Sequence, residues 1–307
     1  MISARPKTFF SGAVALALVF GLTAVNASAT EPSDLESQLY GTRWIAFAPT
    51  NYNPPDKLPS ASSIREDMRT LRSARFDGLI TYGAQLTAVV AIAQEEGFRA
   101  VLIGVWDPGS PEELRLAKES ARNPIVAGII VGNEGLMFGR YNAETLRRAM
   151  VEMRQATGKP VSTTEVVEYF YTRQDLVEWS DFLTVNAHPY FHGHRDPTRA
   201  VDWTLGAWDR LRRHVPMKPI LLKEVGLPTK GDSENSEEVQ REYYRQLLTT
   251  TDVSFTFFEA FDALFKDGPL EKSWGLFRAD RSPKPAATLL LEGNSCVGPL
   301  LRMWCKQ

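Results

Sequence analysis

The amino-acid sequence predicts an α/β protein folded as a single-domain (β/α)8 barrel, the TIM barrel. From Trp44 onward, short β-rich runs alternate eight times with longer amphipathic stretches, and no change in composition divides them. Most of these runs are apolar at consecutive positions, which is typical of parallel strands covered on both faces. Eight successive strand–helix repeats are the number that closes into one barrel.

The expected strands are Trp44 to Phe47, Gly78 to Thr81, Arg99 to Val105, Gly128 to Val131, Pro160 to Thr163, Phe182 to Val185, Pro219 to Leu222 and Ser254 to Phe258. The competing architecture is a doubly wound open sheet with an appended piece. That architecture would require a glycine-rich phosphate-binding turn after an early strand, and the sequence contains none. The closed barrel is therefore the prediction.

The segments between the runs carry helix signals. Ser63 together with Glu66 indicates a capping box at the start of one helix. Ser110, which precedes a proline, indicates the N-cap of another helix. Asn142 precedes apolar residues at helical spacing, and Gly158 follows them as a stop signal.

Composition restricts the function classes. The 307 residues are 43% hydrophobic and 23% charged, values typical of an ordinary globular protein. The formal charge of −2 gives no reason to expect nucleic acid or an anionic membrane as a partner. The arginine-rich stretches at 65–75 and 210–213 are interleaved with apolar residues, which is typical of solvated helix faces. We expect a monomer with no nucleic-acid partner.

Residues 1–29 are predicted to be a signal peptide rather than part of the fold. Arg5 and Lys7 precede a nearly continuous apolar run from Phe9 to Val25, and small residues follow at 27–29. The apolar run is short for a membrane span, which needs about 20 residues. An uncleaved anchor is the alternative. We expect an exported protein, periplasmic or secreted and free of the membrane after cleavage, whose barrel occupies residues 30–295.

Residues 296–307 form a C-terminal tail that contains Cys296 and Cys305, the two cysteines of the chain. In an oxidising compartment such a pair indicates a disulfide that staples the tail. No histidine-bearing motif accompanies either cysteine to suggest a nucleophile, and the pair alone lacks two ligands of a structural zinc site.

Two glutamates stand where a barrel enzyme carries its catalytic groups, at the C-terminal ends of strands. Glu134 follows the fourth run and Glu224 follows the seventh, so the two face each other across the barrel mouth. Glycoside hydrolysis uses two such carboxylates, and a spacing of about 5–5.5 Å makes one of them a nucleophile in a retaining reaction. The alternative, that each glutamate merely ends a strand at the surface, is disfavoured by their pairing.

Aromatic residues follow several strands, and such rings pack against the C–H faces of sugars. They are Tyr82, Trp106, Tyr190, Phe191, Trp274 and Phe277. A histidine tract, His188, His192 and His194 with Asp196, offers metal binding as an alternative. It has no matching ligand elsewhere and equally fits a polar loop, so we expect neither a metal nor another cofactor. The Gly-x-Ser-x-Gly elbow of serine hydrolases is missing from the sequence.

At these residues the sequence resembles glycoside hydrolase family 17, a family of β-1,3-glucanases and related glucanosyltransferases in a retaining barrel clan. The resemblance extends from about Phe47 to Pro285. The matching segments are Val131-Gly132-Asn133-Glu134, Lys223-Glu224-Val225-Gly226-Leu227-Pro228, Phe258-Glu259-Ala260-Phe261-Asp262 with Lys266, Glu271 and Trp274-Gly275-Leu276-Phe277, then Thr81-Tyr82-Gly83 and His188-Pro189-Tyr190-Phe191.

The resemblance implies a role for each matching residue. Glu134 would be the acid/base, with a raised pKa before the first step, and Glu224 the nucleophile. Asn133 would hold the sugar 2-hydroxyl, and Tyr190 would orient Glu224 through a hydrogen bond. The residues expected to position the glucan are Tyr82, Glu259, Lys266 and Glu271, with Trp274 and Phe277 as aromatic contacts.

The sequence also departs from the family pattern. Leu227 stands where a tryptophan is usual, Ala263 where a glutamate is frequent, and Ile80 where an arginine is common. Gly135 and Phe138 differ from the usual residues after the acid/base. These departures concern the binding subsites and leave both catalytic glutamates in place.

Three functions are compatible with this reading. The first is a retaining β-1,3-glucan hydrolase. The second is a β-1,3-glucanosyltransferase, which uses the same covalent intermediate but passes the glucan to another sugar rather than to water. The third is a non-catalytic glucan-binding barrel, against which the presence of both glutamates argues.

Overall fold

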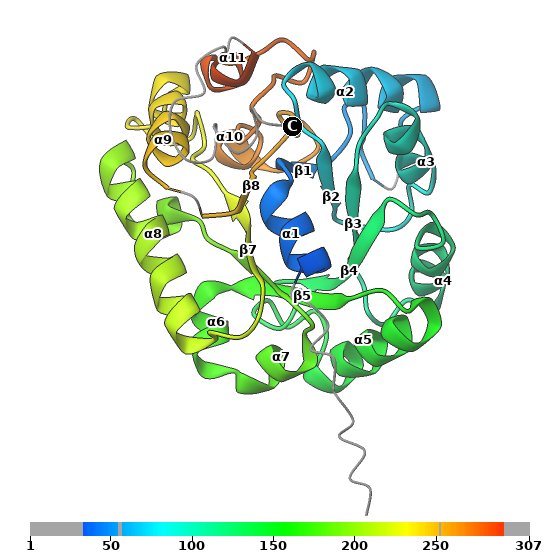
Figure 1. Cartoon of the computed structure of the whole chain (residues 1–307). Coiled ribbons are helices and arrows are strands. Elements are labelled where there is room, and N and C mark those ends of the chain that lie inside the picture. The colour runs from blue at the N-terminus through cyan, green and yellow to red at the C-terminus, as the bar shows by residue number, and fades with distance from the viewer. Residues whose placement is uncertain (1–32, 55–56, 252, 292–307) are drawn as a thin grey trace, which may run out of the picture.

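The computed structural model, which describes residues 33–54, 57–251 and 253–291, contains a closed barrel of eight parallel strands in sequence order (Figure 1). The strands are β1 Trp44–Phe47, β2 Gly78–Thr81, β3 Ala100–Val105, β4 Val126–Asn133, β5 Val161–Val166, β6 Leu183–Asn186, β7 Ile220–Val225 and β8 Phe255–Phe257. The predicted (β/α)8 fold is confirmed. Each expected run coincides with a strand, although β4, β5 and β7 continue further at their carboxyl ends.

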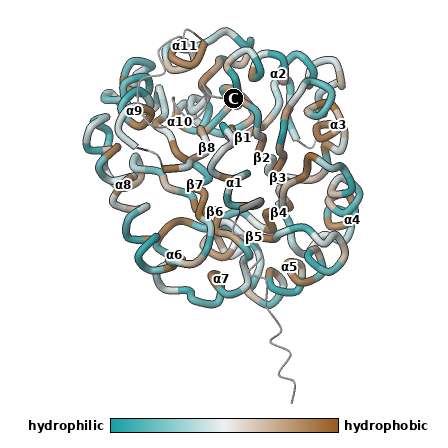
Figure 2. Tube along the Cα trace, in the orientation of Figure 1, coloured by the Kyte–Doolittle hydropathy of each residue, from teal (hydrophilic) through white to brown (hydrophobic). Residues whose placement is uncertain are grey.

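Helices surround the barrel between successive strands (Figure 1). They are α1 Ser33–Gly41, α2 Ala61–Ser73, α3 Ala88–Glu95, α4 Pro111–Ser120, α5 Ala143–Thr157, α6 Val167–Thr172, α7 Gln174–Trp179, α8 Pro197–His214, α9 Glu237–Thr250, α10 Gly268–Glu271 and α11 Pro285–Leu291, with a 3-10 turn, η1, at Pro189–His192. Figure 2 shows the hydrophobic residues concentrated on the strands and on the inward sides of the helices.

Two of the predicted helix caps are confirmed. The side chain of Ser110 accepts a hydrogen bond from the Glu113 backbone N–H at the start of α4, and Asn142 does the same for Thr145 at the start of α5. Gly158 ends α5 in the left-handed conformation, with φ at 66°, a backbone geometry that glycine adopts without a steric penalty.

The capping box predicted at Ser63 and Glu66 is wrong. The N-cap of α2 is Ser60, whose hydroxyl accepts a hydrogen bond from the Ser63 backbone N–H at 3.2 Å. Because several serines occur together in this stretch, the helix begins at the earliest one that can cap it. Ser63 therefore lies within the first turn.

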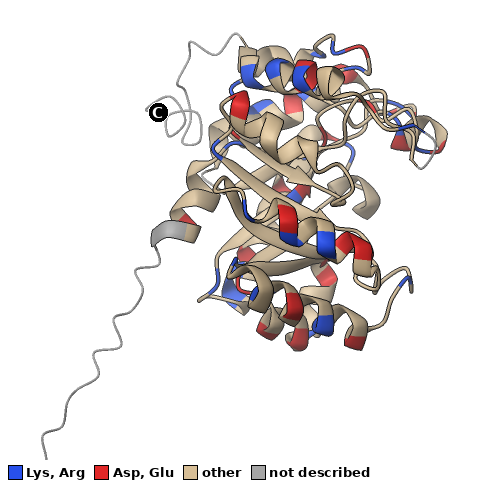
Figure 3. Ribbon diagram, turned by 90° about the vertical axis from the view of Figure 1, so that its right-hand side faces the viewer, with Lys and Arg blue, Asp and Glu red and all other residues tan. Residues whose placement is uncertain are grey.

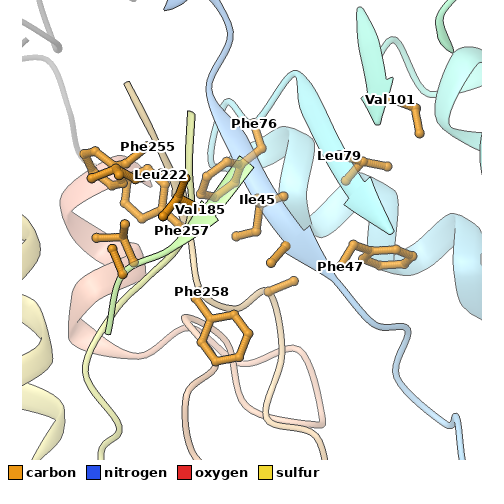
Figure 4. Close-up of a cluster of buried hydrophobic side chains, with 14 of the residues drawn as sticks. Ile45, Phe47, Phe76, Leu79, Val101, Val185, Leu222, Phe255, Phe257 and Phe258 are labelled. Atoms are coloured by element: carbon orange, nitrogen blue, oxygen red, sulfur yellow. The ribbon is translucent and has the colours of Figure 1, made fainter. Parts of the chain in front are cut away.

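The core has two parts because successive side chains on a strand point to opposite faces. One set points outward and packs beneath the helices; Figure 4 shows Ile45, Leu79 and Val101 in this set. The other set fills the barrel near its amino end and includes Trp44, Leu102 and Ile130.

Helix α1, which the sequence analysis did not predict, lies across the amino-terminal opening of the barrel (Figure 1). The carbonyl of Leu39 accepts hydrogen bonds from the Trp44 indole and the Ser254 hydroxyl, both at 2.9 Å. The Tyr40 hydroxyl accepts one from the Ile220 backbone N–H. Helix α1 therefore covers the amino ends of the strands and leaves their carboxyl ends uncovered by it.

Acidic and basic side chains are interspersed over the helices, without a large area of one sign in the view of Figure 3. Helices long and apolar enough to cross a bilayer do not occur within the described ranges. The predicted signal peptide at 1–29 and the predicted Cys296–Cys305 disulfide lie outside the described residues.

Candidate active site

A β-bulge at the end of β4 brings Asn133 and Glu134 together at the barrel mouth. The pairing of β4 with β5 passes from Ile130 opposite Ser162 to Asn133 opposite Thr164, so β4 contains one additional residue there. Gly132 within the bulge has φ at 81°, and a Cβ on it would collide with the Tyr141 hydroxyl. Bulges of this kind redirect side chains near active sites.

The backbone of Glu134 is itself unusual, with φ at 54°. This left-handed region is uncommon for residues other than glycine, so surrounding contacts must hold it in place. The Glu134 N–H donates to the Thr164 carbonyl at 2.7 Å. The Gly135 N–H donates to the Tyr141 hydroxyl at 3.1 Å. The backbone around Glu134 is therefore held by β5 on one side and by the Tyr141 side chain on the other.

Glu165, at the carboxyl end of β5, fixes the turn that follows Glu134. Its two carboxylate oxygens accept hydrogen bonds from the backbone N–H groups of Leu136, at 2.9 Å, and Met137, at 3.3 Å. The sequence analysis missed Glu165 because it ended the fifth strand at Thr163. The feature that could have identified Glu165 is the one that identified Glu134 and Glu224, namely an acidic residue at the end of a strand.

A second bulge, at the end of β7, brings Lys223 and Glu224 to the same side. Val185 of β6 lies opposite Leu222, but the next residue, Asn186, lies opposite Glu224, so Lys223 is the additional residue. Neighbouring residues of a regular strand would point to opposite faces. Here both side chains are buried, Lys223 at 1% and Glu224 at 4% exposure.

The Glu224 carboxylate has one hydrogen-bond partner on each oxygen. Lys223 Nζ donates to Oε1 at 2.9 Å, and His188 Nε2 lies 2.9 Å from Oε2. Burial by itself would raise the pKa of Glu224, but the Lys223 ammonium and the hydrogen bond and charge of His188 outweigh it. The pKa of Glu224 is held well below its usual range, so this carboxyl is ionised.

Glu134 has the opposite electrostatic character. Burial, followed by the charge of Glu224, raises its pKa. A hydrogen bond from Asn186 Nδ2 to Glu134 Oε1 at 2.8 Å and the charges of His188 and Lys223 act against this shift without cancelling it. The site thus contains one ionised carboxylate and one carboxyl whose pKa is raised above its usual value.

A cavity of about 760 Å³ opens beside Glu224, at the carboxyl ends of β8, β1, β2 and β3. Predicted site residues that line it are Tyr82, Asn133, Glu224, Glu259, Lys266 and Glu271. Its walls are largely aromatic and apolar, with contributions from Phe47, Tyr52, Trp106, Phe258 and Phe265. Glu134 is not part of this lining, but its pKa responds to the charge of Glu224.

Polar groups in the cavity wall are arranged to receive hydroxyl groups. Lys266 Nζ donates to Glu259 Oε1 at 2.7 Å, while Glu259 Oε2 has no hydrogen-bond partner among the described residues. Burial and the charges of Glu224 and Glu259 raise the pKa of Tyr82 well above its usual value. The Tyr82 hydroxyl therefore remains protonated and able to donate.

Besides Glu134, three of the predicted site residues lie outside the lining of the cavity. Trp274 and Phe277 are 0% and 1% exposed. Trp274 packs edge-on against His188, with ring centroids 5.1 Å apart, and Phe277 packs against Phe261. These rings belong to the packing beneath the site because the loop after β8 folds back over the barrel.

Tyr190 is the third of these residues, and its predicted role passes to His188. The Tyr190 ring lies beneath the Arg195 guanidinium at 4.7 Å. The hydrogen bonds to Glu224 within the described part of the chain come instead from Lys223 and His188. His188 lies on the segment that directly follows β6, which places its ring beside the end of β7.

The histidine tract does not converge on one point. His188 contacts Glu224, whereas the His192 ring stacks on Trp203 with centroids 4.3 Å apart. Within the described ranges, no group of three or more histidine, cysteine or acidic side chains is arranged to hold a metal ion.

Comparison with known proteins identifies the family. The model of the BtgE/BtgC glycoside hydrolase domain matches residues 45–275, which is most of the barrel and includes both glutamates. The chain belongs to this glycoside hydrolase family. The resemblance to family 17 is confirmed, since a curated relative that matches 78% of this chain at 23% identity is the probable family 17 glucosidase SCW10 of Saccharomyces cerevisiae.

Two curated relatives extend over most of the chain. The cell surface mannoprotein MP65 of Candida albicans is 27% identical over 77% of this chain and 67% of its own length. A glucan 1,3-beta-glucosidase of Arthroderma benhamiae is 25% identical over 90% of this chain and 96% of its own length. The chain spans only about half the length of the related probable beta-glucosidase btgE of Aspergillus terreus.

The fold has solved counterparts. The glycoside hydrolase family 17 beta-1,3-glucanosyltransferase from Rhizomucor miehei superposes with a TM-score of 0.66 at 24% sequence identity. The match covers 80% of this chain and 96% of that enzyme. At this identity the likeness shows that the two proteins share the barrel fold.

Replacement of Glu165 by glutamine is expected to change the pH dependence of stability. Burial raises the pKa of Glu165 to about 7, above its ordinary value of 4.5. The native state therefore holds this proton more tightly than the unfolded state, and the resulting stabilisation is full below pH 4.5 and lost as the pH rises through 7. Glutamine does not titrate, so the stability advantage of the wild type over the variant should shrink with rising pH.

Urea denaturation at pH 4.5 and pH 8 measures this difference in the free energy of unfolding. The matched control is Glu144→Gln, at an exposed position on α5. If the wild type exceeds Glu165→Gln in free energy of unfolding by the same amount at both pH values, the expected link between the Glu165 proton and stability is contradicted.

Proposed function

We propose that this chain is a retaining glycosidase that acts on β-1,3-glucan, with Glu134 as acid/base and Glu224 as nucleophile. The observation that carries the proposal is the opposite electrostatic character of the two carboxyls in one site. The surroundings keep Glu224 ionised and raise the pKa of Glu134. A retaining glycosidase needs this division between an anionic nucleophile and a protonated acid.

The reaction proceeds in two displacements. In the first, the Glu224 carboxylate attacks the anomeric carbon while Glu134 gives its proton to the departing glycosidic oxygen, whose bond to that carbon breaks. In the second, Glu134 takes a proton from the incoming water or sugar hydroxyl, which attacks the same carbon. The bond to Glu224 then breaks, and its electron pair returns to the carboxylate.

The cavity supports a sugar substrate. The rings of Tyr52, Tyr82 and Trp106 offer flat apolar surfaces, which pack against sugar C–H faces. The free Oε2 of Glu259 is placed to accept a hydrogen bond from a sugar hydroxyl. The Arthroderma relative is a glucan 1,3-beta-glucosidase and the Rhizomucor enzyme a beta-1,3-glucanosyltransferase, which supports that linkage here.

Transfer to a sugar acceptor is the second candidate. Two aromatic side chains, Phe138 on the segment after Glu134 and Phe191 after β6, are 64% and 59% exposed. Exposed rings near the acid/base could bind an acceptor sugar in place of water, as transglycosylation requires. A purely glucan-binding barrel would have no need of two carboxyls with opposed pKa shifts.

Export is also part of the proposal. The predicted signal peptide at residues 1–29 supports it, as does the likeness to a cell surface mannoprotein of Candida albicans. The mature protein would then act in the periplasm or outside the cell as a monomer.

Product sizing tests the proposed substrate and separates the two reactions. The purified protein should convert a β-1,3-linked gluco-oligosaccharide and leave a matched β-1,4-linked one intact. Shorter products alone would support hydrolysis, whereas products longer than the input would establish transfer. Equal conversion of both linkages, or of neither, would contradict the proposed substrate.

Replacement of Glu134 by alanine tests the acid role. We expect turnover of natural glucan to fall by roughly 10²–10⁴-fold, the usual contribution of general acid catalysis. An aryl glycoside with an acidic phenol as leaving group needs little protonation, so its first step should be largely spared. Comparison of kcat/KM on both substrates gives the answer. Equal losses would count against the assignment of Glu134.

A further inference from the structure

The nucleophile has a buried cation as its direct neighbour in the sequence. Lys223 Nζ lies 2.9 Å from Glu224 Oε1, and the Lys223 side chain is 1% exposed. A lysine is rarely buried so completely unless it is paired. The β7 bulge, which is visible in the pairing with both β6 and β8, turns this side chain into the barrel rather than toward the helices.

Further contacts hold the ammonium group of Lys223 in one place. Nζ donates a hydrogen bond to Asn133 Oδ1 at 2.7 Å and lies 4.4 Å from the centre of the Tyr82 ring. Lys223 therefore connects the end of β7 with the residue that precedes Glu134 on β4. It faces the nucleophile from inside the barrel, while His188 holds the other carboxylate oxygen.

The charge of Glu224 changes during the proposed reaction, and that of Lys223 does not. When Glu224 is bonded to the anomeric carbon it is a neutral ester, and the hydrogen bond from Lys223 loses its anionic acceptor. Charge-assisted hydrogen bonds are roughly twice as strong as neutral ones. The lysine thus stabilises the states before and after the covalent intermediate more than the intermediate itself.

We propose that Lys223 is a positioning residue that drives the departure of Glu224 from the covalent glycosyl-enzyme. This inference rests on the proposed function, since it presupposes the covalent intermediate. As the bond between the anomeric carbon and Glu224 breaks, negative charge returns to the carboxylate beside the ammonium group. The second displacement is accelerated by this contact, whereas the first, in which the carboxylate gives up its charge, is not.

The test is the kinetics of Lys223→Met, which keeps the length of the side chain and removes its charge. With 2,4-dinitrophenyl β-laminaribioside, kcat/KM reports the first displacement and kcat reports the second when the intermediate accumulates. We expect kcat to fall by about 10- to 100-fold, as for loss of one charge-assisted hydrogen bond. We expect kcat/KM to change by no more than about threefold, so that KM falls together with kcat.

The intermediate itself is a second readout. Mass spectrometry of acid-quenched enzyme should show a larger fraction carrying a laminaribiosyl group in Lys223→Met than in the wild type. The matched control is Lys266→Met, the same substitution at a lysine of the cavity wall that pairs with Glu259 instead of Glu224. It should weaken substrate binding and raise KM without an increase in the labelled fraction.

Lys223→Gln decides the question if the methionine variant does not fold. Glutamine is one atom shorter and uncharged but retains N–H donors in its amide, so kcat should fall while kcat/KM is largely kept. Equal losses in kcat and kcat/KM, with no added labelling in a folded variant, would overturn the inference. Wild-type enzyme that neither turns over the substrate nor becomes labelled would instead refute the proposed function.

Discussion

Alternation along a β-strand is the constraint on which the site depends. A regular strand sends neighbouring side chains to opposite faces, so it can place only every second residue inside a barrel. The bulges at the ends of β4 and β7 break this rule at two places. The second bulge lets Lys223 and Glu224 contact each other, and the first is followed directly by the left-handed backbone of Glu134. The pKa values of the two carboxyls are therefore shifted in opposite directions. The Lys223 ammonium helps to keep Glu224 ionised, and the charge of Glu224 adds to burial in raising the pKa of Glu134.

Buried carboxylates hold the loops that form the site. Glu113 of α4 accepts hydrogen bonds from the backbone N–H groups of Ala84, Trp106 and Asp107, which follow β2 and β3. Glu165 does the same for the turn after Glu134. Each of these carboxylates replaces the water that a loop backbone would otherwise bind, and burial makes that exchange costly unless the bonds are complete. The cavity walls are therefore fixed before the substrate arrives.

The barrel could be predicted from the sequence because parallel buried strands leave a distinct apolar pattern, and the candidate glutamates because catalytic groups stand at strand ends. Helix α1 could not be predicted in this way, because the opening that it covers exists only once the strands have assembled into a barrel. The bulges could not be predicted either. The residues around Lys223 do not indicate whether its side chain faces Glu224 inside the barrel or a helix outside it. The burial of Trp274 and Phe277 could not be predicted for a related reason, since it depends on how the loop after β8 packs.

The central claim is that Glu224 forms a covalent bond with the sugar, and an inactivator tests it most directly. A β-laminaribioside with fluorine at position 2 and a good leaving group should allow the first displacement and slow the second. Digestion and mass spectrometry then locate the attached sugar. The account predicts labelling on Glu224 in the peptide that contains Lys223, with loss of activity in proportion. Labelling on Glu134 or Glu259, or turnover without any label, would contradict it.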